Sequence, residues 1–344
     1  MTADSAGFDT AHLGAIRRAV DNRRLRNLHA VVVMRHGRLV FEDYFTGRDE
    51  AWGRPLGEVK FGPDTIHDVR SVTKSIVSLL FGIAQAQGMV GSIDRPLLDA
   101  FPEFADLQRE PTRMKILVKH ALTMTMGTEW DETISYADPS NSERRMEDAS
   151  DRYRFVLDRP IVLAPGERWN YNGGATAVIA KIVSRGAGRS LDAFAKEHLF
   201  GPLGITETEW ITDRAGEAIA ASGLRLRPRD LAKIGQLVLD HGRWDDREIV
   251  PKAWLDESTR PRIDAEPGVR YGYFWWTASS GFGDAAVSWV AGFGNGGQRV
   301  FVIPELDLVV VVTAGNYNEP EQWRTRMAVL NQFVLPALAA GPGA

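Results

Sequence analysis

A serine and a lysine three residues apart, Ser71 and Lys74, are the residues whose types and spacing most directly suggest chemistry. They occur in the stretch DVRSVTKSIVSLLFG, at the start of an otherwise apolar run. On a helix this spacing places both side chains on one face. Burial lowers the pKa of a lysine, so a neutral Lys74 could take the Ser71 hydroxyl proton. The alternative is that Ser71 only caps a helix and Lys74 reaches water.

The run after Ser71 predicts a buried helix. From Ser75 onward, apolar residues as far as Ala84 cover nearly the whole circumference of a helix. Gly88 is typical of the residue just past a helix end. We therefore expect Ser71 at the N-terminal end of a buried helix.

Two further segments carry residue types that suit the same chemistry. The segment LAPGERWNYNGG places Tyr171 and Asn172 between a Pro-Gly turn and a new helix, in a loop that can bring a phenol to a site. The segment AGFGNGGQRVFVIP places Asn295 among glycines, where another group can approach the backbone. Each segment alone also fits a structural role, as a core aromatic or a tight turn.

Composition limits the classes of protein that fit. The chain has 344 residues, 44% of them hydrophobic, which is enough for two lobes with a large core. A net charge of -4 gives no reason to expect a nucleic acid or a membrane as partner. The absence of cysteine excludes a thiolate nucleophile and a disulfide. Without a signal-like N-terminus or a long apolar span, we expect a soluble, cytoplasmic protein.

Strand patterns at both ends with helices between them predict an α+β fold, an antiparallel sheet of N- and C-terminal strands flanked by helices. We expect residues 1–87 and 171–344 to form this lobe and residues 88–170 a mostly helical second lobe. The predicted elements are a helix at 10–22, a hairpin with its turn at RHGR, strands at 271–277, 286–293, 298–304 and 306–315, and a last helix with Trp323, Met327, Leu330 and Val334 on one face.

In their order and spacing, these motifs resemble the serine β-lactamase and penicillin-binding-protein superfamily. The resemblance is to its class C β-lactamase-like branch, which includes esterases and 6-aminohexanoate-dimer hydrolases, and it spans residues 28–335. The matching segments are SVTK (71–74), LTMTMGTEWDE (122–132), PGERWNYNGG (165–174), SGLRLRPRDLAKIGQLVL (222–239), YGYFWW (271–276) and GNGGQ (294–298).

The resemblance implies a role for each matched residue. Ser71 would form an acyl-enzyme, Lys74 would accept its proton or keep that acceptor ionised, and Tyr171 would pass a proton to the leaving group. The backbone of the strand motif, with the Ser71 amide, would form the oxyanion hole. The residues of that motif are Asn295, Gly296, Gly297 and Gln298. The resemblance implies no metal and no cofactor.

Two departures from the family pattern bear on the substrate. Gly173 stands where the Tyr-x-Asn element ends, and GNGG has no lysine to hold an anionic carboxylate. We therefore expect a hydrolase of small esters or amides, with a β-lactamase or D-alanyl-D-alanine peptidase of the same fold as the alternative. Natural substrate and oligomeric state stay open.

Other residues beside the motifs are tentative substrate contacts. Asn172 is a candidate for the role of the missing asparagine, and Asp131 in the acidic Glu129–Glu132 turn is a candidate for binding a substrate amine. Some aromatic residues are expected to line an apolar pocket, although core packing fits each of them equally well. These aromatics are Trp130, Tyr136, Trp169, Trp289 and Phe293.

Rival chemistries have weaker support. Arg35-His36-Gly37 is similar to the motif of histidine phosphatases, but the alternating strand after it favours a hairpin tip. There is no G-x-S-x-G and no H-E-x-x-H, and the seven histidines are scattered, so no metal site is predicted. His67 fits a local hydrogen bond better than a base. A non-catalytic binding module would leave the serine, lysine and tyrosine unexplained.

Overall fold

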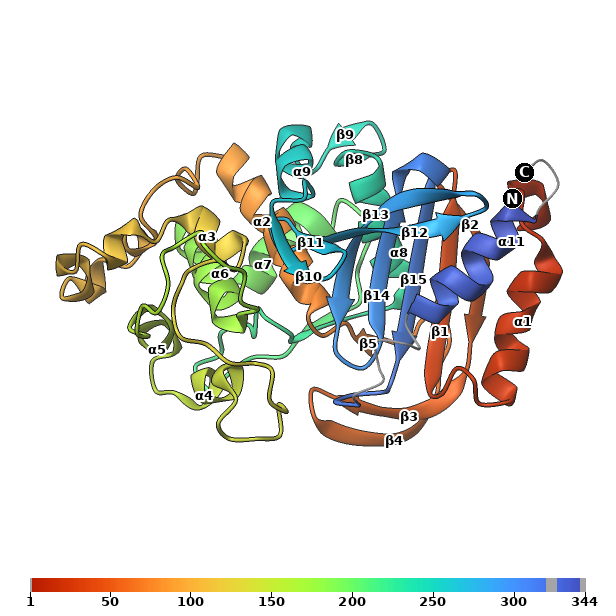
Figure 1. The fold of residues 1–344 in the computed structure, drawn as a ribbon, viewed down its shortest axis with the longest axis horizontal. Helices are drawn as coiled ribbons and strands as arrows, with labels where there is room; N and C mark the ends of the chain where they lie inside the picture. The colour runs from red at the N-terminus through yellow and green to blue at the C-terminus, as the bar shows by residue number, and fades with distance from the viewer. Residues whose placement is uncertain (1, 320–326, 341–344) are drawn as a thin grey trace.

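An antiparallel sheet forms the centre of the computed structural model, which describes residues 2–319 and 327–340 (Figure 1). Strands from the two ends of the chain meet in it, which confirms the predicted α+β fold. In sheet order the strands are β10 (Ile263–Glu266), β11 (Val269–Tyr271), β12 (Trp276–Phe282), β13 (Ala285–Gly294), β14 (Gln298–Ile303), β15 (Leu308–Ala314), β1 (Leu28–Arg35) and β2 (Arg38–Tyr44).

Smaller sheets lie outside the central one. They are built from β3 (Thr46–Ala51) with β4 (Arg54–Lys60), from β5 (His67–Asp68) with β7 (Leu224–Leu226) and β6 (Thr208–Trp210), and from β8 (Arg243–Trp244) with β9 (Arg247–Glu248). The predicted hairpin is confirmed, because β1 and β2 pair around His36 and Gly37. Both turn residues have positive φ, as a tight two-residue hairpin requires.

Helices cover both faces of the central sheet. In Figure 1, α1 and α11 lie in front of it, while α8 packs against β14, β15 and β1 on the other side. Because both faces are covered, every residue of β15 is buried, which explains its run of four valines. The helices are α1 (Thr10–Asp21), α2 (Val72–Ala86), α3 (Val118–Leu122), α4 (Ser142–Asp148), α5 (Arg152–Leu157), α6 (Gly173–Ala187), α7 (Leu191–Ala195), α8 (Pro228–Leu239), α9 (Lys252–Ser258) and α11 (Leu335–Ala339).

The segment 88–170 consists of short helices, 3-10 turns and loops. Its helices α3 and α5 pack on α6, which begins at Gly173, and α6 packs on α2. The helical layer on the left of Figure 1 therefore includes residues beyond 170. The lobe boundary at residue 170 stays a prediction.

One predicted element differs in the structure. Residues 271–277 are not one strand, because Gly272–Trp275 leave the sheet between β11 and β12. Phe274 there has a φ of 62° and its N–H donates to the Leu122 carbonyl, so the segment packs on the end of α3. α2 begins at Val72, which places Ser71 at its N-terminal end as predicted. In the last helix Leu330 and Val334 are buried as predicted, while Trp323 lies outside the described residues.

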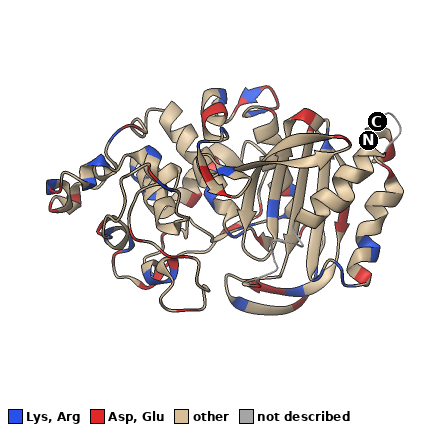
Figure 2. Ribbon diagram, in the orientation of Figure 1, with Lys and Arg blue, Asp and Glu red and all other residues tan. Residues whose placement is uncertain are grey.

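Charged residues of both signs are interspersed over the ribbon, and the central strands carry few of them (Figure 2). Within residues 2–319 and 327–340, no helix combines the length and the apolar character needed to cross a membrane.

Candidate active site

Ser71 and Lys74 meet at the start of α2. The Ser71 side chain makes no capping hydrogen bond to the helix. Instead, the Lys74 ammonium donates to Ser71 Oγ at 3.0 Å and to the Ala221 carbonyl at 2.9 Å. The helix around them is buried from Val72 to Ala84, so the lysine does not reach water. Ser71 is therefore not a capping serine through its side chain, and Lys74 is not exposed; activation of Ser71 by Lys74 stays a prediction that this contact permits.

The pKa of Lys74 shifts in the direction opposite to the one predicted from burial alone. Burial is the largest single influence and lowers the pKa of the amine, but the acidic groups of Tyr171, Glu143 and Glu132 together outweigh it. The pKa of Lys74 is therefore raised above that of an ordinary lysine. This direction opposes the hypothesis of a lysine kept neutral by burial, because helical spacing around Lys74 cannot show which distant carboxylates will surround it; the role of Lys74 as proton acceptor stays a prediction.

Glu143 on α4 is the carboxylate that faces the lysine. Its Oε2 lies 3.9 Å from Lys74 Nζ, and both side chains are buried. Its other oxygen accepts a hydrogen bond of 3.2 Å from the Ser222 hydroxyl. Oε2 itself has no hydrogen-bond partner among the described residues. A buried acceptor in this position can receive a proton from Lys74.

Glu132 forms a second buried carboxyl beside this pair. It accepts hydrogen bonds from the Trp130 indole N–H, from the Gly173 backbone N–H and, at 2.9 Å, from the Tyr136 hydroxyl. Burial, followed by the charge of Glu143, raises the pKa of Glu132 to about 8 against the opposing effects of Lys74 and the hydrogen bonds. At neutral pH most Glu132 is therefore protonated.

The pKa of Glu132 makes the stability of the protein depend on pH. Because the pKa is raised on folding, the folded state binds more protons than the unfolded state between about pH 4.5 and 8, and stability falls across that range. We expect the free energy of unfolding of wild type, relative to Glu132→Gln, to decline by up to about 1.4 kcal/mol per pH unit there. Urea unfolding of both proteins from pH 5 to 8 measures this. Parallel pH curves would contradict the assignment.

Tyr171 completes the group around Ser71. Its ring centre lies 4.9 Å from Lys74 Nζ, and Ser71 is among the groups that influence the pKa of its hydroxyl. Burial raises the pKa of this phenol, and the nearby Lys74 opposes the rise only in part. Tyr171 is therefore a neutral phenol at neutral pH, and it can donate a proton.

A strained turn lies directly before Ser71. Arg70 has a φ of 48°, which is uncommon for a residue with a Cβ and costs on the order of 1–3 kcal/mol. Its guanidinium lies 3.1 Å from Asp68, pairs with Glu50, and lies 4.6 Å from the centre of the Tyr317 ring. These contacts hold the turn that orients Ser71.

Ser71 lies between two adjoining hollows of about 480 and 640 Å³. Tyr136 and Asn295 line both hollows, as expected of candidate site residues. The larger one has an aromatic wall, in which Trp276 lies between Trp169 and Phe293 with ring centres 5.5 Å from each. Trp276 was not among the residues predicted from the sequence, because its side in the broken 271–277 segment could not be assigned.

Several predicted contacts do not lie in the hollows. The Asn172 side chain accepts from the Ala175 N–H and so caps α6. Trp130 is buried, and its indole N–H donates to Glu132. Trp289 is also buried, and its N–H donates to the Ser280 hydroxyl. Asp131 is exposed and binds Thr133 within its own turn. In the acidic turn, Glu132 and not Asp131 lines the larger hollow. The sequence could not show which of these acidic residues points inward.

Of the four residues of the strand motif, only Asn295 lines the hollows beside Ser71. The Gln298 side chain is fully buried, and its amide bonds the Ala314 backbone and the Asn295 carbonyl. Gly296 and Gly297 lie in the turn before it and do not line the hollows. The backbone beside Ser71 is the end of β13, Phe293 to Asn295, where a Cβ on Gly294 would lie 2.4 Å from the Val69 carbonyl.

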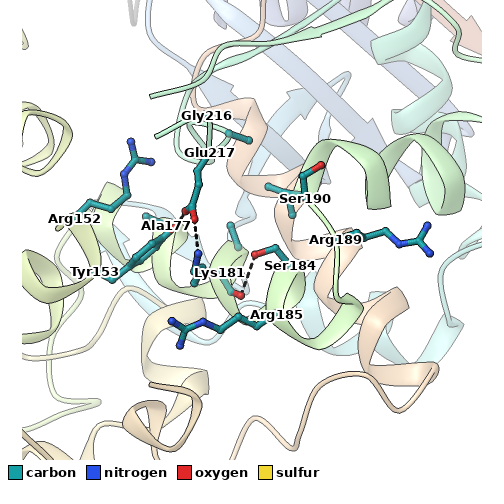
Figure 3. Close-up of a pocket in the computed structure, with 13 residues that line it drawn as sticks. Arg152, Tyr153, Ala177, Lys181, Ser184, Arg185, Arg189, Ser190, Gly216 and Glu217 are labelled. Atoms are coloured by element: carbon teal, nitrogen blue, oxygen red, sulfur yellow. Dashed lines mark hydrogen bonds and ion pairs between the residues drawn. The ribbon is translucent and has the colours of Figure 1, made fainter. Parts of the chain in front are cut away.

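A separate hollow of about 270 Å³ lies between α6 and the 216–218 segment (Figure 3). Its central charges pair with each other, because Lys181 contacts Glu217, which also accepts from the Tyr153 hydroxyl. It contains none of the predicted site residues.

The fold is that of the serine β-lactamases and penicillin-binding proteins. A β-lactamase/D-alanine carboxypeptidase from Pseudomonas syringae aligns with a TM-score of 0.65 at 18% identity, over 93% of this chain and 97% of that one. The Beta-lactamase family model matches residues 16–332, so the chain belongs to the beta-lactamase family. This confirms the resemblance inferred from the motifs.

Two curated relatives show the range of proteins to which the chain is similar. A 6-aminohexanoate-dimer hydrolase from Paenarthrobacter ureafaciens is 26% identical over 274 residues, 73% of this chain and 66% of that protein. A lovastatin esterase from Penicillium rubens is 27% identical over 202 residues, 52% of this chain and 49% of that protein. The match thus spans about two thirds of the first relative's length and about half of the second's.

Proposed function

We propose that the protein is a serine hydrolase that cleaves small carboxylic esters or amides through an acyl-enzyme on Ser71. The observation that carries this proposal is the buried ammonium of Lys74, 3.0 Å from Ser71 Oγ and 3.9 Å from Glu143. The similarity to an esterase and to an amide hydrolase of the same family supports it. No step of the proposed reaction uses a metal ion or a cofactor.

The charges suggest a route for the serine proton. As Ser71 Oγ attacks the carbonyl carbon of the substrate, Lys74 takes the serine proton and passes one of its own protons to Glu143 Oε2, for which their 3.9 Å separation must shorten to hydrogen-bond length. When the intermediate collapses, Tyr171 donates its proton to the departing alcohol or amine and regains one from Lys74, which regains one from Glu143. A water molecule then attacks the acyl carbon, and one of its protons passes through Tyr171 to Ser71 Oγ as the bond to the acyl group breaks.

The oxyanion of the intermediate needs backbone donors beside Ser71. We place them at the Ser71 amide and at the end of β13, between Phe293 and Asn295, because this backbone lines the larger hollow. Such donors stabilise the transition state most when they are fixed in advance. The packing of Gly294 against Val69 holds the strand end in place.

The charges of the larger hollow indicate which substrates fit. Among the described residues that line it, Glu132, Glu266 and Glu319 are acidic, and none is a lysine or an arginine. An anionic carboxylate would find no cation there, whereas a neutral or amine-bearing chain meets no repulsion. This favours esters and amides over β-lactams, whose ring carboxylate is anionic.

Three p-nitrophenyl esters of matched acyl length test this proposal. We expect kcat/KM for the butyrate and the 4-aminobutyrate esters to exceed that for the hemiglutarate ester by at least about tenfold, roughly 1.4 kcal/mol. Nitrocefin, an anionic β-lactam, is the fourth substrate and should be the poorest. Faster turnover of the hemiglutarate ester or of nitrocefin would favour a β-lactamase or peptidase instead.

A further inference from the structure

Two histidines and an aspartate that are distant in sequence meet in a buried cluster outside the candidate active site. His29 lies on β1, Asp49 on β3 and His67 on β5, and all three are buried. His29 Nδ1 lies 2.8 Å from His67 Nε2, and Asp49 Oδ1 lies 3.6 Å from His67 Nε2 and 4.0 Å from His29 Nδ1. No metal site was predicted from the sequence because its histidines are scattered along the chain, but the fold brings two of them together.

The outer hydrogen bonds assign the proton on each ring. His67 Nδ1 lies 2.8 Å from the Asp68 carbonyl, which can only accept, so Nδ1 carries the proton and Nε2 a lone pair. His29 Nε2 lies 3.2 Å from Asn27 Oδ1. Asn27 cannot be flipped, because its nitrogen donates to the Arg48 carbonyl and its oxygen accepts from the Arg48 N–H. His29 Nε2 therefore carries the proton, and Nδ1 has the lone pair.

Three acceptors thus face one another: a lone pair from each imidazole and an oxygen of Asp49. Within the cluster, the Tyr317 hydroxyl donates at 2.8 Å to Asp49 Oδ1, but no donor lies between the two rings. Facing lone pairs at this distance repel each other unless a cation lies between them. A proton or a metal ion between the two ring nitrogens would remove this repulsion.

We propose that His29, Asp49 and His67 bind one divalent transition-metal ion, of which Zn²⁺ best suits two imidazoles and a carboxylate. A point equidistant from the three facing atoms, whose separations are 2.8, 3.6 and 4.0 Å, lies about 2.1 Å from each, which is the length of a zinc–ligand bond. This point lies in the plane of the three atoms, so the two ring nitrogens must move apart for the ion to reach tetrahedral geometry. The Tyr317 hydroxyl or a water supplies the fourth ligand. The bonds from the rings to Asn27 and the Asp68 carbonyl are the outer contacts that orient metal-binding histidines.

The surroundings of the cluster are built closely around His29. A Cβ on Gly47 or on Gly315 would lie 2.7 or 2.6 Å from an atom of the His29 ring. The Phe61 ring stacks on it with ring centres 4.0 Å apart. The ion would tie β1, β3 and β5 together just before the strained turn at Arg70. We therefore assign it a structural role, in holding the segment that leads to Ser71.

The test uses the full chain, stripped with a chelator and titrated with Zn²⁺ alone. We expect wild type to retain one equivalent of zinc after desalting, and its Tm to rise by at least about 2 °C at a hundredfold excess over Kd. His67→Gln and Asp49→Asn should each weaken zinc binding at least about tenfold. His36→Gln, which changes an exposed histidine paired with Asp307, is the matched control and should bind as wild type does.

Retention of less than a tenth of an equivalent by wild type would overturn the proposal and leave a shared proton between the rings. Equal binding by the two site variants and the control would also overturn it, by placing the ion elsewhere. If a variant fails to fold, the Co²⁺-loaded wild type tests the site instead. Two paramagnetically shifted imidazole N–H signals, one from His29 and one from His67, would support the site, and their absence would contradict it.

Discussion

Ser71→Ala should lower kcat/KM for p-nitrophenyl butyrate by roughly 10⁴- to 10⁶-fold, because no other hydroxyl can form the acyl-enzyme in its place. The loss should appear in kcat, with little change in KM, since the alanine leaves both hollows open. Stopped-flow measurement of p-nitrophenol release gives both constants. The initial burst of product, if wild type shows one, should disappear as well.

Ser78→Ala is the matched control for this substitution. Ser78 is buried on the same helix, and its hydroxyl has no hydrogen-bond partner among the described residues. We expect it to keep kcat/KM within about twofold of wild type, since it removes a hydroxyl that bonds to no other group and that lies about two helical turns from Ser71. If both variants lost activity equally, the effect would belong to the helix and not to the nucleophile.

Glu143→Gln should lower kcat by about 10²- to 10⁴-fold, the range of a general base, while KM changes little. Glutamine keeps the size of the side chain and its bond from Ser222 but cannot take a proton from Lys74. Glu143→Asp should recover part of the rate, because it restores a carboxylate at a longer distance. Steady-state kinetics with p-nitrophenyl butyrate gives kcat and KM for wild type and both variants.

Asp148→Asn removes a carboxylate from the same helix and the same hollow, and so controls for the loss of negative charge. Asp148 is exposed and lies 3.8 Å from Arg144. Its variant should retain the wild-type rate. A similar fall in kcat for both variants would show that charge in the hollow matters and not proton acceptance by Glu143.

Periodicity predicted the large elements well. The hairpin of β1 and β2, the buried α2 with its stop at Gly88, and the valine-rich β15 all follow from local patterns that tertiary packing reinforces. The segment 271–277 failed because its backbone bonds to Leu122 and Ser75, contacts between distant parts of the chain that override its strand propensity.

The candidate site could be predicted only where a motif fixes the position of a residue. The pair Ser71 and Lys74 is local to one helix, so its geometry follows from spacing. Glu143 and Glu132 carry the electrostatics of the site, but they come from another part of the chain and no motif marks them. The sequence therefore could not show the groups that raise the pKa of Lys74, and it missed the meeting of His29 with His67 for the same reason.

The most direct test of the central claim is to trap the nucleophile. The full-length protein is incubated with a fluorophosphonate, its intact mass is measured, and the modified peptide is sequenced by mass spectrometry. The account predicts a single adduct on Ser71, absent from Ser71→Ala. Ester turnover without any adduct, or an adduct on another residue, would contradict it.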